Sequence, residues 1–161
     1  MKLFKSEHEK LSSVSINPFS LEKEIQDLIE KNVSELFELE FVKSELKVQN
    51  FRFDTLCFDK SSNSFVIIEY KRGTNYSVID QGYTYLSLLL NNKSDFILEY
   101  NETTGSTIKR DEVDWSQSRI IFISPKFSDY QKTSINFKNV PFELWEITRF
   151  KNELIGLNQI V

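Results

Sequence analysis

The sequence predicts an α/β sandwich in which helices flank a central mixed β-sheet. The chain has 161 residues, of which 40% are hydrophobic, and it contains 14 Phe but only 4 Gly and 3 Pro, which favours regular secondary structure over disorder. Segments with helical spacing of apolar residues are interspersed with short strand-like runs. The length fits one domain over residues 1–161, with its core at about 18–124 and strand or helix additions after it.

The first forty-eight residues predict an arm, a helix and an extended segment. Residues 1–17 are polar and irregular and predict a short strand or an arm. Ser20 is the expected N-cap of an amphipathic helix that runs to about residue 38, and a break near Asn32 is left open. Residues 39–48 then predict a strand or an extended link.

The middle of the chain predicts a hairpin followed by a helix. Residues 50–58 and 64–71 are strand-like and are separated by the polar turn "DKSSNS". Apolar residues at helical spacing predict a second helix over 76–91, in which Gly82 is a tolerated weakness. A three-strand meander followed by a crossover helix fits this order better than regular βα alternation.

The last third of the chain predicts further strands. Residues 95–100 predict a short strand and 101–115 a surface loop. The nearly all-apolar run 119–124 is typical of a strand covered on both faces. Residues 127–135 fit a helix, and 142–150 alternate in polarity as a last strand.

Composition excludes several classes of site. Cys57 is the single cysteine and His8 the single histidine, so an internal disulfide, a Cys/His zinc site and His-based catalysis are all excluded. The N-terminus lacks the pattern of a signal peptide, and no run approaches the length of a membrane span, so a cytoplasmic protein without membrane contact is expected. A net charge of −4 argues against a general nucleic-acid coat protein but does not exclude a nuclease.

Three charged residues lie where apolar residues would be expected. Glu69 and Lys71 are two apart on a predicted strand and so project from the same face, and Asp54 on the preceding hairpin strand falls opposite them. Two converging carboxylates would bind a hard cation such as Mg²⁺. The alternative is an exposed ion pair at a strand end. The apolar surroundings "FVIIEYK" favour the first interpretation, because burying such charges costs several kcal/mol per ion unless they are paired or metal-bound.

The spaced motifs carry a family resemblance. "RFD" at 52–54, "VIIEYKR" at 66–72 and "DQGYTYL" at 80–86 together resemble the PD-(D/E)xK nuclease superfamily, in its NucS-like branch. "LEKEIQDLIEKN" at 21–32 resembles the first helix of that branch, and the likeness extends less specifically to "WSQSRIIFIS" at 115–124. Phe53 stands where the pattern that names the superfamily has Pro. The resemblance implies a restriction endonuclease-like fold.

The resemblance also implies roles for individual residues. Asp54 and Glu69 match the metal-ligand positions, for Mg²⁺ or Mn²⁺, and Lys71 matches the motif lysine. Gln81 matches the glutamine of the following helix. Tyr85 lies one turn further on the same face and is a candidate substrate contact, with helix packing as the alternative.

Three further residues are candidates at the edge of this site. Glu22 matches the first-helix glutamate, and Glu24 competes for the role. Glu22 is preferred because it shares a helical face with apolar residues, although an acidic residue near a helix N-terminus needs no catalytic role. Arg52 and Arg72 are candidates for phosphate contacts, with surface ion pairs as the alternative.

The expected function is therefore a Mg²⁺-dependent nuclease, an endonuclease acting on DNA. The alternative is a nuclease-fold module that has lost catalysis and binds nucleic acid or a protein partner. A homodimer is left open, as are DNA against RNA, single strand against duplex, endonuclease against exonuclease, and sequence preference.

Overall fold

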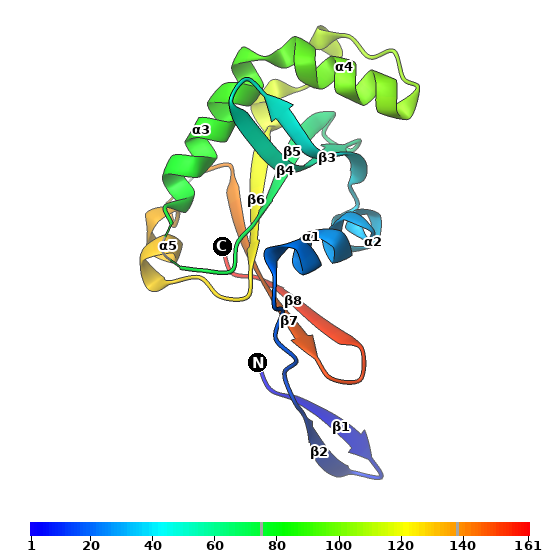
Figure 1. The fold of residues 1–161 in the computed structure, drawn as a ribbon, viewed down its shortest axis with the longest axis vertical. Helices are drawn as coiled ribbons and strands as arrows, with labels where there is room; N and C mark the ends of the chain where they lie inside the picture. Colours follow the sequence, from blue (N-terminus) through cyan, green and yellow to red (C-terminus); the bar gives the residue numbers. More distant parts are fainter. Residues whose placement is uncertain (75, 138) are drawn as a thin grey trace.

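The computed structural model describes residues 1–74, 76–137 and 139–161. Its centre is a six-stranded mixed sheet in the order β3-β4-β5-β6-β7-β8, seen edge-on in Figure 1. The pairs β3–β4, β4–β5 and β7–β8 are antiparallel, and β5–β6 and β6–β7 are parallel. The strands are β3 (Glu40–Val48), β4 (Phe51–Asp59), β5 (Ser64–Tyr70), β6 (Arg119–Ser124), β7 (Phe142–Phe150) and β8 (Leu154–Gln159).

Helices cover both faces of this sheet, so the predicted α/β sandwich is confirmed (Figure 1). One face packs against the first two helices and the other against the third and fourth. The helices are α1 (Glu22–Glu30), α2 (Val33–Phe37), α3 (Val78–Asn91), α4 (Lys93–Thr104) and α5 (Asp129–Ser134), with 3₁₀ turns at Arg110–Glu112 and Trp115–Gln117. None of the helices in the described ranges has the length and apolar character that crossing a bilayer requires.

Strand β5 is the centre of the core, because all seven of its residues are buried. Val66 and Ile68 face α1 and α2, whereas Phe65 and Ile67 face α3 and α4. By the two-residue period of a strand, Glu69 shares the face of Ile67 and points toward α3. The fold thus places a carboxylate in the layer between the sheet and a helix.

The predicted meander and crossover are present. Strands β3, β4 and β5 follow one another antiparallel, and α3 and α4 then connect β5 to the parallel strand β6. The break that the sequence left open near Asn32 separates α1 from α2. Residues 1–17 form the expected arm, which contains the hairpin of β1 (Leu3–Glu7) and β2 (Lys10–Val14).

The prediction of a strand over 95–100 is wrong, because these residues lie inside α4. Phe96 and Tyr100, four residues apart, are both buried, whereas Leu98 between them is exposed. Phe96 packs on Phe53 and Phe65 of the sheet with centroid distances of 5.6 and 6.0 Å. A six-residue run is too short to distinguish the helical period of 3.6 residues from the strand period of two. The helix ends at Gly105, whose φ is 71°, and the loop begins there.

Two boundaries also differ from the prediction. Leu21, not Ser20, occupies the N-cap position of α1, and the Ser20 N–H instead donates to Glu24 Oε1 at 2.7 Å. Residues 142–150 are not the last strand, because β8 follows β7 after a short turn. The four apolar residues of 154–157 and the polar residues after them carry no strand alternation that would have revealed it.

Candidate functional site

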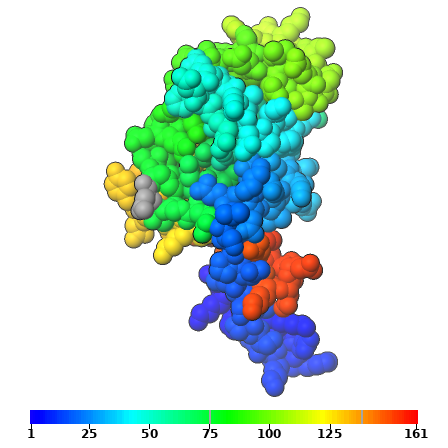
Figure 2. All heavy atoms as spheres, viewed as in Figure 1, coloured from blue at the N-terminus to red at the C-terminus, as the bar shows by residue number. Residues whose placement is uncertain are grey.

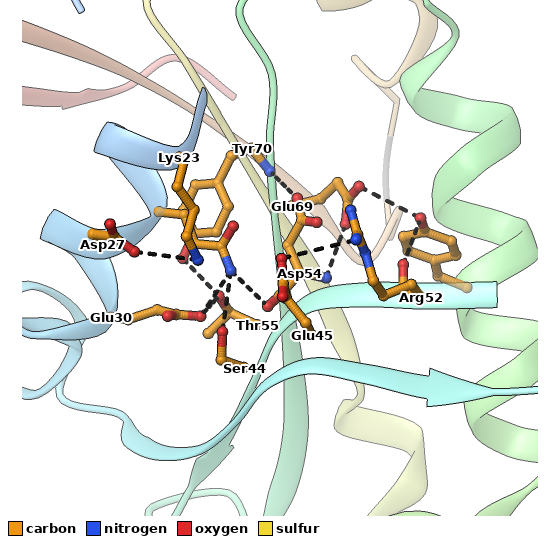
Figure 3. Close-up of polar contacts among 12 residues, drawn as sticks. Lys23, Asp27, Glu30, Ser44, Glu45, Arg52, Asp54, Thr55, Glu69 and Tyr70 are labelled. Atoms are coloured by element: carbon orange, nitrogen blue, oxygen red, sulfur yellow. Dashed lines mark hydrogen bonds and ion pairs between the residues drawn. The ribbon is translucent and has the colours of Figure 1, made fainter. Parts of the chain in front are cut away.

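Asp54 and Glu69 are neighbours across the β4–β5 pair. The Asp54 N–H donates to Glu69 Oε2 at 3.4 Å, and the Tyr70 N–H donates to Asp54 Oδ2 at 3.1 Å. Figure 3 shows both carboxylates between α1 and α3, at the end of β5. Backbone hydrogen bonds therefore hold two acidic side chains at one point of the sheet.

Lys71 directly follows β5 and brings a positive charge to the same point. Its Nζ atom lies 3.6 Å from Glu69 Oε1 and 5.2 Å from the ring centroid of Tyr76. The side chain is only partly exposed, so the aromatic ring and the buried carboxylate together restrict it. The ammonium group is available to a negatively charged ligand on the side that faces solvent.

Helix α3 supplies two polar groups to Glu69. The Gln81 amide donates through Nε2 to Glu69 Oε1 at 3.3 Å and to the Tyr85 hydroxyl at 3.0 Å, and that hydroxyl lies 3.4 Å from Glu69 Oε1. Gln81 and Tyr85 are one turn apart, so both reach the sheet from the same helical face. The Gln81 Oε1 atom is buried and has no hydrogen-bond partner among the described residues.

Burial raises the pKa values of both carboxyl groups, and the charge of Asp54 raises that of Glu69 further. Glu69 is 4% exposed, and burial together with the charge of Asp54 raises its pKa from 4.5 to about 8. Burial also raises the pKa of Asp54, although the Tyr70 N–H and the Lys71 charge oppose the shift. A cation between the two groups would favour the charged form of each.

Gln26 of α1 contacts the peptide of Asp54 from the other side. Its buried amide donates to Asp54 O, to Ser44 Oγ and to Glu30 Oε2, each at 3.2 Å. No motif marks this residue as part of the site. The signal was a polar side chain beside Ile25 and one turn before Ile29, on the face of α1 that packs on the sheet.

The regular alternation of β4 is interrupted at Asp54. Phe53 packs edge-to-face on Tyr85 of α3 with a centroid distance of 4.8 Å. Thr55, two residues later, instead points toward α1, where its hydroxyl donates to Glu30 Oε2 at 2.6 Å and lies 2.9 Å from the Tyr70 hydroxyl. A regular strand would direct both residues to one face. The carbonyl of Asp54, which lies between these two residues, accepts from the Gln26 amide.

The first-helix acids occupy different places. Glu22 is exposed, contrary to the buried direction that its helical face predicted, because it is the first residue of α1 and projects past the turn that packs on the sheet. Its charge nevertheless reaches Tyr76, whose pKa is raised mainly by burial and further by Glu22 and Glu69. Glu24 accepts from the Ser20 and Leu21 N–H groups and therefore holds the start of α1.

The candidate substrate contacts differ in exposure. Arg52 is exposed and lies 3.9 Å from Glu45, as in the surface ion pair that was the alternative. Arg72 is exposed and donates to the carbonyl of Ser20. Tyr85 is buried, so its hydroxyl reaches Glu69 rather than the solvent. The two arginines form the surface around the site, and Tyr85 lies beneath it.

The described residues contain no group of three or more His, Cys, Asp or Glu side chains arranged to hold a metal ion. Asp54 and Glu69 form a pair. A Mg²⁺ ion commonly takes one or two carboxylates and completes its shell with water and substrate oxygens. A pair of carboxylates is therefore a sufficient protein contribution for this ion, whereas a structural zinc site would need four ligands.

Comparison with known proteins gives one sequence relative. No family model matches the chain. An uncharacterized protein of Haemophilus influenzae is 51% identical over 160 residues, which are 99% of this chain and 53% of the relative. The chain thus spans about half the length of the curated relative it matches.

Three solved structures have a similar arrangement of elements. A repair endonuclease from Pyrococcus abyssi is 19% identical, with a TM-score of 0.49 over 78% of this chain and 47% of its own. EndoMS without ligand is 18% identical, with a TM-score of 0.46 over 88% and 63%. An EndoMS–dsDNA complex is 16% identical, with a TM-score of 0.43 over 90% and 65%.

Proposed function

We propose that this protein is a metal-dependent nuclease that hydrolyses phosphodiester bonds, with DNA as the substrate and Mg²⁺ or Mn²⁺ as the cofactor. The observation that carries the proposal is the position of Glu69. A buried carboxylate lies next to a second carboxylate, an ammonium group and an amide, on the strand and helix where the resemblance to PD-(D/E)xK nucleases placed them. Isolated surface ion pairs do not need such surroundings.

The donor atoms at this point fit a hard divalent cation. Asp54 and Glu69 would hold it through oxygen, and their pKa values stay raised by burial although the Lys71 charge opposes the shift of each. The buried Gln81 Oε1 atom without a partner fits a site that is completed by a ligand or a water molecule. When bound there, the cation would neutralise charge that develops on the phosphate and lower the pKa of a water molecule.

The protein's own groups have separate roles in this proposal. Lys71 directs its ammonium group toward the phosphate or toward the attacking water, beside the carboxylate it already contacts. Gln81 and Tyr85 donate to Glu69 Oε1 and so fix the direction of that carboxylate. Gln81 Oε1 can accept a hydrogen bond from the water. Arg52 and Arg72 lie at the surface, where a phosphate backbone would pass.

A second candidate is a module of the same fold that binds nucleic acid or a protein without cleaving it. The net charge of −4 favours this alternative, because neutralising a long phosphate backbone takes many Lys and Arg contacts. The two candidates differ in one requirement, since only the nuclease needs both carboxylates and Lys71 to be intact.

The test is a cleavage assay on single-stranded DNA, duplex DNA and RNA, each with Mg²⁺ and with Mn²⁺. We expect the parent protein to cleave DNA and Asp54→Asn to be inactive. Asp95→Asn is the matched control, because Asp95 is an exposed acid in the first turn of α4 and should cleave at the parent rate. If the parent protein cleaves none of the substrates with either metal, the binding module becomes the leading candidate. Cleavage by Asp54→Asn at the parent rate would exclude the proposed site.

A further inference from the structure

The N-terminal hairpin forms an arm that extends away from the rest of the molecule. In this hairpin β1 and β2 pair with each other, with Leu3 opposite Val14 at the base and Glu7 opposite Lys10 near the tip. Figures 1 and 2 show the arm projecting away from the helices, beside and beyond the end of the β7–β8 hairpin. It joins the body at Ser15 and Asn17, which form backbone hydrogen bonds with Lys151 and Arg149 at the end of β7.

The two faces of this arm differ in character. Phe4 is paired with Ser13 and Leu11 with Ser6, so these four residues share one face that carries no charge. The opposite face carries Lys5, Glu7 and Lys10. Phe4 is 47% exposed and Leu11 is 62% exposed. The arm therefore presents an aromatic and an aliphatic side chain on one uncharged surface.

Such an arm calls for a partner. A two-stranded hairpin is marginally stable in water unless its apolar face packs against something. Nucleic acid is a poor match for the uncharged face. On the other face Lys5 is paired with Glu7 at 2.8 Å, which leaves Lys10 as the other lysine of the two strands, whereas a phosphate backbone takes many such contacts. An apolar groove matches Phe4 and Leu11 better.

The body of the same molecule has such a groove, between the helices α1 and α2 and the β7–β8 hairpin. It consists of two hollows of about 700 and 230 Å³ that share Leu28 and Ile155 in their walls. Phe19 and Phe150 also line the larger hollow, and Leu36, Ile147 and Leu157 line the smaller. Ile155 is 43% exposed. The floor is apolar where the two hollows meet at Leu28 and Ile155, and the Arg149 guanidinium lies over the Phe19 ring in the larger hollow.

Charges on the rim of the groove alternate in sign. Asp27 and Lys31 lie on the side of α1, and Lys151 and Glu153 lie on the side of the β7–β8 turn. The charged face of the arm has the same mixture of Lys and Glu. Asp27 is already paired with Lys23 at 3.3 Å. An arm that placed its uncharged face on the groove floor would therefore have Lys31, Lys151 and Glu153 as charged neighbours for its edges.

We propose that this protein forms a symmetric dimer in which the arm of each copy lies in the groove of the other. Asn17, from which the arm leaves the body, is itself a wall residue of the larger hollow, so arm and groove are adjacent in each molecule. A two-fold axis near Asn17 would then exchange the two arms and fill both grooves at once. The occupant is a second copy of this chain, and the arrangement is independent of whether the protein cleaves DNA.

The first test measures mass in solution by analytical ultracentrifugation. We expect the parent protein to sediment as two chains and the double variant Phe4→Ser/Leu11→Ser as one. Ser12→Ala changes an uncharged residue on the opposite face of the same arm and should remain two chains. Phe4, Leu11 and Ser12 are all exposed, so none of these changes should unfold the body. A parent protein that stays a single chain at every concentration, or a dimer that survives Phe4→Ser/Leu11→Ser, would overturn the proposal.

The second test reads the contact itself by disulfide cross-linking. Leu11→Cys and Ile155→Cys are prepared separately, mixed, allowed to exchange subunits and oxidised; the native Cys57 is buried and should not compete. We expect a cross-linked pair of chains from the mixture and none from either variant alone. A cross-link that forms equally well with Leu11→Cys alone would mean that arm packs against arm, which contradicts the arm-in-groove dimer.

Discussion

Asp54 donates its backbone N–H to Oε2 of Glu69, so the strand that carries one carboxylate also orients the other. The Asp54 side chain in turn accepts from the N–H of Tyr70, the residue after Glu69. These two bonds hold like charges together by main-chain geometry, at the point where the regular pattern of β4 is interrupted. Two carboxylates this close repel each other unless a positive charge lies between them. The stability, metal affinity and activity of the protein should therefore respond when either carboxylate or its neighbours are changed.

Removing the charge of Glu69 should stabilise the metal-free protein at about pH 8. The raised pKa of Glu69 means that the folded state keeps a proton that the unfolded state releases between pH 4.5 and about 8, so parent stability falls as pH rises through this window. At about pH 8, the upper end of this window, Glu69→Gln should be more stable than the parent by about 1 kcal/mol, which corresponds to about 2–4 °C in Tm. Thermal melts in chelator at about pH 5 and pH 8 measure this difference.

The same melts provide their own control when Mg²⁺ is added. The metal binds deprotonated carboxylates, so it should raise the Tm of the parent more at pH 8 than at pH 5 and leave Glu69→Gln nearly unchanged. A large loss of stability in Glu69→Gln at both pH values would instead identify Glu69 as a structural residue.

Replacing Lys71 should separate catalysis from metal binding. Its ammonium group lies 3.6 Å from Glu69 and cannot itself be a metal ligand, so Lys71→Ala should retain metal affinity while cleavage falls by roughly 10²- to 10⁴-fold. Titration calorimetry with Mn²⁺ and the cleavage rate at saturating metal give the two readings. Lys60→Ala is the matched control, because Lys60 pairs with Glu40 at the surface. Parent-like cleavage by Lys71→Ala would show that its proposed role is wrong.

Gln26 should act as a positioning residue for Asp54. Gln26→Ala removes the amide that holds the Asp54 carbonyl, and we expect metal affinity or cleavage to fall about 10- to 100-fold, as for other residues that orient metal ligands. Ser44→Ala removes another partner of the same amide without touching Asp54. If Ser44→Ala loses as much stability and as much activity as Gln26→Ala, the contact between Gln26 and Asp54 has no special importance.

The central part of the fold could be predicted from the sequence because its signals are local. β5 and β6 are short but contain continuous runs of Val, Ile and Phe, which favour a buried strand, and the helical spacing of α3 extends over 14 residues. Residues 95–100 were assigned wrongly because Phe96 and Tyr100 are buried by a helical period that six residues cannot reveal. The strand β8 was missed because Leu154 to Leu157 do not alternate in polarity.

The candidate site was predictable to a different degree. Glu69 and Lys71 share a strand, so their proximity follows from a two-residue period. The contact of Gln26 with Asp54 links residues 28 apart through the docking of α1, and periodicity within one element carries no information about it. The position of Glu22 around the helix axis predicts that it faces the site. Such a position does not show how far along the helix the packed face extends, and Glu22 is the first residue of α1 and is exposed.

Gly82 makes room for Phe142 where α3 crosses the sheet, so its replacement should test how tightly this helix is held. A Cβ atom at Gly82 would lie 2.6 Å from Cζ of Phe142, closer than van der Waals contact allows. The Phe142 ring packs edge-to-face on Tyr83 and Phe122, with centroid distances of 5.0 and 6.3 Å, so it has little freedom to move away.

Two opposing effects decide whether Gly82→Ala raises or lowers the free energy of unfolding. Alanine favours the helix over glycine by about 1 kcal/mol, whereas overpacking a core typically costs about 1–3 kcal/mol. The short contact distance places the overpacking cost toward the upper end of this range. We therefore expect Gly82→Ala to lower the free energy of unfolding, measured in urea, by about 1 kcal/mol or more. Gly73→Ala should change it by less than about 0.5 kcal/mol, because no heavy atom of the described residues lies within 4 Å of the added Cβ. Adding Phe142→Leu should recover part of the loss in Gly82→Ala, and strictly additive effects would mean that the two residues do not meet.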